Sequence, residues 1–196
     1  MRLTRMLTLA VLLPLGFSAC RTLPTSTGIP WPERRLALQA LEHYGFHGQL
    51  AAATATAGFS ATLNWQQQGV ASDAQLRAPL GLGGAHLIFD GAQLQFTASN
   101  GSQVAGVAAR EAMISMFGFE PPLSSLRYWL LGVPDPRAPG EEALDAAQRL
   151  AQLSQSEWQI NYGDYVHEGA GWLPGLVTLR HADVRLKVHI RHWQLP

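Results

Sequence analysis

The sequence is poor in cysteine and in charge. Of its 196 residues only Cys20 is a cysteine, and charged residues make up 14% of the chain, against roughly 25% in an average soluble domain. A single cysteine excludes a disulfide within the chain. Basic and acidic residues balance at 14 each, so no strong field attracts nucleic acid. We therefore expect no nucleic-acid partner.

The chain also lacks the motifs of common enzymes. It has no Gly-x-Ser-x-Gly nucleophile elbow, and its glycine-rich stretch 81–84 lacks the lysine and the following helix of a phosphate-binding loop. The seven histidines show no spacing typical of a zinc site. The sequence therefore predicts a protein that is not an enzyme and has neither metal nor cofactor. An esterase acting on lipids is a distant alternative.

The N-terminus has the pattern of an export signal. Arg2 and Arg5 precede an apolar stretch over residues 6–17, and Ser18 and Ala19 supply small residues directly before Cys20. The stretch is too short for a membrane-spanning helix, which needs about 20 apolar residues. A signal that ends at a cysteine predicts a lipoprotein, cleaved after residue 19 and lipidated on Cys20. The alternative is an ordinary secretory signal with an unrelated cysteine nearby.

The residues that follow indicate a destination and a tether. Arg21 stands where an aspartate would be the usual signal for retention in the inner membrane of Gram-negative bacteria, so we expect the outer membrane, with the protein facing the periplasm. Residues 20–31 are rich in proline, threonine and glycine and predict a flexible tether. Residues 32–196 then form a single domain, long enough to bury a core.

Hydrophobic periodicity predicts strands on both sides of a helical insert. The expected helices cover residues 31–43, 110–117 and 122–131, and a polar loop covers 133–142. The expected strands cover residues 59–66, 75–78, 85–89, 93–97, 149–155, 157–162, 176–180 and 184–193. Asp90-Gly91 is a strong hairpin signal, and Ala182-Asp183 is expected to join the last two strands as a hairpin. Gly118 is expected to cap the second helix, and the odd spacing of His189 and His192 predicts opposite faces of the last strand. This order predicts a mainly β protein with helices (α+β), in which one antiparallel sheet curls toward a barrel and leaves an apolar cavity where helices fill the mouth only partly.

Two features are candidates for a functional site. Leu80 and Leu82 lie in a Pro-Gly-rich segment between strands, where an exposed leucine forfeits roughly 1.5–3 kcal/mol of burial, so we predict an apolar loop that meets a partner or membrane. The alternative is that both fold back into the core. Six tryptophans predict either an apolar cavity or ordinary core packing. Our candidates for lining such a cavity are Trp65, Phe89, Phe96, Met113, Trp129, Leu130, Trp158 and Ile160.

Several stretches resemble the outer-membrane lipoprotein receptor LolB family. They are Leu63-Asn64-Trp65-Gln66-Gln67, Pro79-Leu80-Gly81, Met113-Ile114, Pro122-Leu123-Ser124-Ser125-Leu126-Arg127-Tyr128-Trp129-Leu130-Leu131-Gly132-Val133-Pro134 and Trp158-Gln159-Ile160-Asn161-Tyr162. The resemblance implies an incomplete antiparallel β-barrel, capped by short helices, around a hydrophobic cavity.

The resemblance also implies a function. Such a receptor accepts lipoproteins from the periplasmic carrier LolA, with their acyl chains as transient ligands, and inserts them into the inner leaflet of the outer membrane. Leu80 matches the leucine of a protruding membrane-insertion loop, and a monomer is expected. An acyl chain costs on the order of 10 kcal/mol to expose to water, so it needs an apolar pocket in transit. The alternative function is a structural outer-membrane lipoprotein that scaffolds an envelope assembly complex through a filled barrel.

Overall fold

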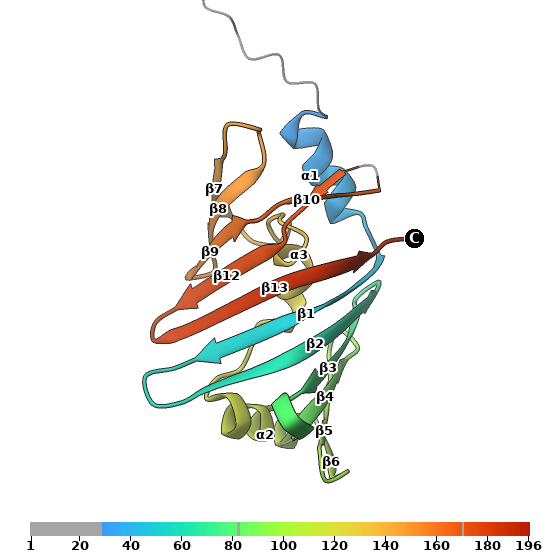
Figure 1. Cartoon of the computed structure of the whole chain (residues 1–196), viewed down its shortest axis with the longest axis vertical. Coiled ribbons are helices and arrows are strands. Elements are labelled where there is room, and N and C mark those ends of the chain that lie inside the picture. Colours follow the sequence, from blue (N-terminus) through green and yellow to red (C-terminus); the bar gives the residue numbers. More distant parts are fainter. Residues whose placement is uncertain (1–28, 82, 170) are drawn as a thin grey trace, which may run out of the picture.

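An antiparallel sheet of 11 strands forms most of the protein and curves around helices (Figure 1). The structure is a computed structural model that describes residues 29–81, 83–169 and 171–196. The predicted signal peptide, Cys20, most of the predicted tether and Leu82 lie outside the described residues. The sheet does not close on itself within those described ranges, because β6 and β7 form its two edges. The prediction of an incomplete barrel is confirmed.

The elements follow one another along the chain as helix, strands, two helices and strands. The helices are α1 (Trp31–Gln39), α2 (Val107–Phe117) and α3 (Leu123–Trp129), and η1 (Pro79–Gly81) is a short 3-10 turn. The strands before α2 are β1 (His43–Ala53), β2 (Gly58–Gln68), β3 (Ala71–Arg77), β4 (Gly84–Phe89), β5 (Leu94–Ala98) and β6 (Gln103–Ala105). The strands after α3 are β7 (Gly140–Leu144), β8 (Leu150–Gln155), β9 (Trp158–Gly163), β10 (Val166–Glu168), β11 (Gly171–Leu173), β12 (Leu176–His181) and β13 (Val184–Gln194).

Strand β1 is the largest departure from the expected elements. The first helix ends at Gln39 instead of about residue 43, and β1 follows within a few residues. Its glycines and alanines have low strand propensity, so the sequence signal is weak. The strand forms because it pairs along its whole length with β2 on one side and, from Gly45 onward, with β13 on the other. It thereby joins the N-terminal and C-terminal halves of the sheet.

A glycine permits the close approach of β1 to β13. The register between them shifts between His47 and Gly48, which leaves an extra residue in β13. A side chain at Gly48 would stand 2.4 Å from the backbone oxygen of His189, so only glycine fits there. The bulge also changes the alternation of β13. His189 and His192, expected on opposite faces from their spacing, are both exposed.

The remaining differences are local. The predicted hairpins β4–β5 and β12–β13 are confirmed, and Gly118 ends α2 in a left-handed conformation as expected of a C-cap. The strands predicted over 149–155 and 157–162 form and pair as β8 and β9. Strand β3 begins at Ala71, earlier than expected, and β7 begins inside the expected loop 133–142. Strands β6, β10 and β11 were not predicted, because three-residue strands carry too little periodicity to detect.

The sheet has two faces with different roles. Side chains of the inner face, such as Leu63, Trp65 and Leu186, are buried in the core together with residues of α2 and α3. We call the opposite face, whose side chains alternate with these and are mostly exposed, the outer face. Helix α3 lies behind the sheet in Figure 1, while α2 covers the end formed by β5 and β6. In the described part of the chain, no helix has the length and apolar character needed to cross a membrane.

Candidate functional site

An apolar pocket lies between the inner face of the sheet and the helical cap formed by α2 and α3. Its volume is about 60 Å³. Every side chain that lines it is apolar: Leu50, Phe59, Leu63, Trp65, Ala74, Leu76, Leu87, Phe117, Phe119, Pro121, Leu123, Leu126, Leu130, Leu179, Leu186 and Val188. A water molecule needs two to four polar partners to enter a cavity, so this pocket stays dry.

The pocket is too small for a fatty-acyl chain as it stands. A cavity of about 150 Å³ holds one benzene molecule, with six carbon atoms, so a sixteen-carbon chain needs on the order of 400 Å³. The walls must therefore move before such a ligand can enter. The sheet wall is continuous through β4, β3, β2, β1, β13 and β12. The cap is thus the wall that can move without breaking the hydrogen-bond ladder.

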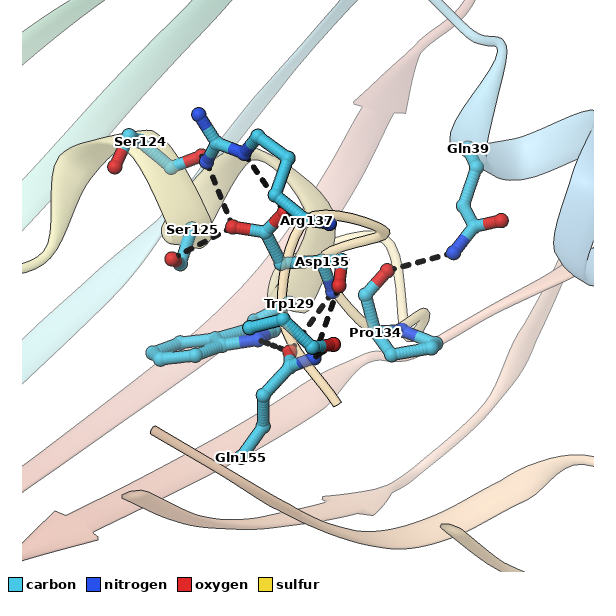
Figure 2. A network of polar contacts seen from close by, with 9 residues as sticks. Gln39, Ser124, Ser125, Trp129, Pro134, Asp135, Arg137 and Gln155 are labelled. Carbon is cyan, nitrogen blue, oxygen red and sulfur yellow. Dashed lines mark hydrogen bonds and ion pairs between the residues drawn. The ribbon is translucent and has the colours of Figure 1, made fainter. Parts of the chain in front are cut away.

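The α3 end of the cap is fixed by a buried polar network (Figure 2). The Gln155 side chain, on β8, accepts hydrogen bonds from the Trp129 indole at 2.7 Å and from the Asp135 backbone N–H at 2.8 Å. Its amide donates to the backbone oxygens of Asp135 and Ala138. The bond from Trp129 ties α3 itself to the sheet, and the other three tie the segment after α3. Removing Gln155 would leave buried donors and acceptors unpaired, which is costly.

Asp135 forms the second half of this network. Its carboxylate, 3% exposed as a residue, accepts hydrogen bonds from Ser125 Oγ at 2.9 Å and from the Arg137 guanidinium at 2.6 Å and 2.9 Å. Burial opposes ionisation of this carboxyl, but the hydrogen bonds and charge of Arg137 and the Ser125 hydroxyl outweigh it and lower the pKa of Asp135. The carboxylate therefore stays charged and holds α3 in place.

The start of α2 is attached to the sheet, because the backbone N–H of its N-cap Gly106 donates to the Leu94 oxygen of β5 at 2.8 Å. The C-terminal end of α2 has no side-chain hydrogen bond to the sheet within the described ranges. Phe117 stacks on Phe59 of β2 with ring centroids 4.9 Å apart. Residues 118–122, which we call the cap link, join α2 to α3. Their one ion pair, between Glu120 and Arg110 at 3.3 Å, stays inside the cap and is exposed. This end is held by apolar contacts alone, so it opens at lower cost than α3 does.

Leu80 is the second part of the site. It is 95% exposed and adopts a left-handed backbone conformation, with φ 58° and ψ 19°. A leucine in this conformation costs about 1–2 kcal/mol relative to its usual regions. The turn therefore combines conformational strain with an apolar side chain in water. Neither benefits the isolated fold, which is typical of a position kept for function.

The predicted lining residues fall into two groups. Trp65 and Leu130 line the pocket. Phe96, Met113, Trp129, Trp158 and Ile160 are buried elsewhere in the core, and Phe89 is half-buried beside it. Whether any of them contacts a ligand stays a prediction.

Sequence reasoning missed much of the pocket wall because it favoured aromatic residues. Leu63 of β2 lies opposite Leu76 of β3, and Leu87 of β4 lies opposite Ala74 of β3; all four line the pocket. Their alternation with polar neighbours was visible in the sequence. What it could not show was that these strands lie under α2. No group of three or more histidine, cysteine, aspartate or glutamate residues suited to a metal ion occurs in the described chain.

A curved, unclosed sheet with an all-apolar pocket under a helical cap defines a half-barrel protein with an internal apolar site. Residues 42–193 match the family described as Outer membrane lipoprotein LolB. The chain is 37% identical over 166 residues to the outer-membrane lipoprotein LolB of Nitrosococcus oceani, covering 84% of this chain and 83% of that protein. It is 33% identical over 202 residues to that of Alkalilimnicola ehrlichii, covering 100% and 99%. The chain belongs to the LolB family, which assigns it to the outer membrane as a lipoprotein.

Solved structures of low sequence identity share the fold. A LolA superfamily protein from Nitrosomonas europaea superimposes with a TM-score of 0.55 at 7% identity, over 86% of this chain and 94% of that one. A domain from Vibrio parahaemolyticus, described as a putative outer membrane lipoprotein-sorting protein, gives a TM-score of 0.53 at 6% identity, over 84% and 90%. The half-barrel is thus shared with chains that have little sequence in common with this one.

Proposed function

We propose that this protein receives the acyl chains of lipoproteins from the carrier LolA in its apolar pocket and releases them into the outer membrane through the Leu80 turn. The observation that carries the proposal is the pairing of an all-apolar pocket with a leucine that is 95% exposed. One holds a fatty chain away from water, and the other reaches a bilayer. Lipidation of Cys20 would keep the receptor at its target membrane.

Transfer of this kind needs no covalent chemistry. Each methylene buried is worth about 0.8 kcal/mol, so a chain moves wherever its burial is most complete. A receptor pocket that buries the anchor better than the carrier does draws it from LolA, and the bilayer then draws it from the receptor. No nucleotide or metal is required for these steps.

Entry requires the pocket to widen several-fold, and we assign the opening to the cap link and the end of α2. Phe117, Phe119 and Pro121 form that wall of the pocket. Movement there separates the Phe59–Phe117 stack and leaves the Asp135–Gln155 network intact. The α3 end then serves as the fixed side against which the cap opens.

The small volume of the pocket is also compatible with the alternative function, a scaffold with a filled core. Ligand binding distinguishes the two functions. The purified chain is mixed with an environment-sensitive apolar dye and then with LolA carrying a lipoprotein. We expect the dye to bind and the incoming lipoprotein to displace it. A scaffold would bind neither, and absence of both signals would overturn the proposal.

The Leu80 turn is tested separately from the pocket. We expect Leu80→Glu to take up lipoprotein from LolA at the normal rate and to fail in delivery to vesicles, because a carboxylate does not enter hydrocarbon. Normal delivery by Leu80→Glu would exclude the turn from membrane insertion while leaving the pocket assignment intact.

A further inference from the structure

The outer face of β12 and β13 carries an exposed row of basic side chains. We call it the basic stripe, and its members are Arg180, Arg185, Lys187, His189 and Arg191. None of the five takes part in an ion pair within the described part of the chain. The stripe includes Lys187, the only lysine of the sequence. The chain as a whole has no net charge, so this concentration of positive charge is local.

The stripe is not explained by the stability of the fold. Arg180 lies directly opposite Arg185 in the antiparallel register, and both are exposed. Like charges in this position are destabilising. The nearby carboxylates are occupied elsewhere: Asp183 accepts a hydrogen bond from the Ala55 backbone N–H, and Glu157 lies 3.5 Å from His181. The arrangement lowers its energy when an anion from outside the protein meets it.

The stripe and the Leu80 turn border the same depression of the outer face. This depression has a volume of about 590 Å³. Pro79, at the start of the turn, lines one side, Lys187 and His189 line another, and residues of β1 and β2, most of them small or polar, lie between them. Asp164 is the single carboxylate among the lining residues. An apolar residue is therefore placed beside a cationic surface, as required at a bilayer interface.

The N-terminal helix and the Leu80 turn lie toward opposite ends of the molecule (Figure 1). Helix α1 lies at one end of the long axis, whereas α2 and the green turn η1 lie toward the other (Figure 1). The first described residue, Ile29, is nine residues after Cys20, and an extended chain of that length spans about 30 Å. A lipid on Cys20 and an inserted Leu80 would hold the long axis along the membrane, with the outer face of the sheet turned toward it.

We propose that the basic stripe binds the phosphate groups of membrane phospholipids while Leu80 enters the hydrocarbon. The proposal rests on the function proposed above and identifies the surface that meets the membrane. Lysine and arginine near a membrane surface attract anionic lipid, and an arginine fork matches phosphate geometry. An acidic protein surface would match the charge as well. The shared depression with the Leu80 turn favours the lipid.

Vesicle binding tests the stripe. The chain from residue 20 onward, with Cys20→Ser so that no lipid is attached, is titrated with vesicles of phosphatidylethanolamine and phosphatidylglycerol. Each basic residue removed should weaken binding roughly fivefold, so the variant R180Q/R185Q/K187Q should bind on the order of 100-fold more weakly. The matched control R180K/R185K/K187R keeps every charge and should bind within about twofold of the parent. Added salt should weaken the parent far more than the glutamine variant.

The outcomes separate this proposal from the function it rests on. Equal binding of the parent and the glutamine variant to these vesicles would refute the proposal that the basic stripe binds phospholipid. If the glutamine variant bound vesicles normally but lost uptake from LolA, the stripe would be a protein-docking surface, and the proposal would again be wrong. Failure of the parent to take up any lipoprotein would count against the receptor function. The vesicle experiment would still show whether the basic stripe binds lipid. Should the triple variant unfold, single K187Q gives the same readout with a fivefold effect.

Discussion

Leu80 offers a test in which stability and function should change in opposite directions. Its side chain is 95% exposed, so it gains almost nothing from packing, and its left-handed conformation costs about 1–2 kcal/mol. Asparagine adopts that conformation more readily. We expect Leu80→Asn to raise the free energy of unfolding by about 1 kcal/mol and the melting temperature by about 2–4 °C for a domain of this size.

Delivery should fall in the same variant. A leucine transferred from water to an apolar phase gains roughly 1.5–3 kcal/mol, and asparagine does not. That difference corresponds to roughly a 10- to 100-fold slower release of lipoprotein into vesicles. Uptake from LolA should not change, because the turn is not part of the pocket wall. Thermal unfolding by circular dichroism and transfer from preloaded receptor to vesicles measure the two effects.

Leu80→Ile provides the matched control. It keeps the apolar surface but places a β-branched side chain in a left-handed conformation, which is more strained. Stability should fall and delivery should persist. An asparagine variant that delivers at the normal rate, or that is less stable than the parent, would refute the reasoning for Leu80.

Three further expectations concern the cap. Gln155→Leu leaves the Trp129 indole and a backbone N–H buried without partners and should destabilise the fold by about 2–4 kcal/mol, measured by urea unfolding; a loss below 1 kcal/mol would contradict the network. The lowered pKa of Asp135 means that its contribution to stability is present above about pH 4 and is lost as the pH falls through the folded-state pKa, so Asp135→Asn should flatten the acid limb of the stability curve. Phe117→Ala should cost about 3–5 kcal/mol of stability yet speed dye entry, because it removes the wall that must move; slower entry would place the opening elsewhere.

Local sequence signals predicted the elements whose causes are local. Asp90-Gly91 indicated the β4–β5 hairpin, and Gly118 indicated the end of α2, because a turn or a cap depends on a few adjacent residues. The alternation in β13 likewise separated its buried residues from its basic ones. Strand β1 was missed because its stability comes from pairing with β2 and β13, which lie elsewhere in the sequence.

The candidate site also has one part that the sequence indicated and one part that depends on tertiary packing. The sequence identified Leu80 as an apolar residue out of place between strands but left open that it folds back into the core, and the structure shows that it is exposed. The sequence assigned only part of the pocket wall, namely Trp65 and Leu130. Trp129 is a large aromatic residue of the kind expected to line a cavity. Its indole N–H instead donates a hydrogen bond to Gln155, which lies 26 residues further along the chain and belongs to the polar network. Which apolar residue borders empty space depends on how helices and sheet pack.

By itself, the amino-acid order determined the class of fold, the expected lipid attachment at Cys20 and the family resemblance, and it marked Leu80 as an apolar residue in a loop, since each depends on short-range pattern. Only the tertiary structure decided that Leu80 is exposed, that the first and last long strands meet, and that the pocket is small. It also decided that α3 is fixed by a buried network, whereas the C-terminal end of α2 has no side-chain hydrogen bond to the sheet within the described residues. The physical reason is that pairing and packing join residues far apart in the chain, and their free energies appear only once those residues are brought together.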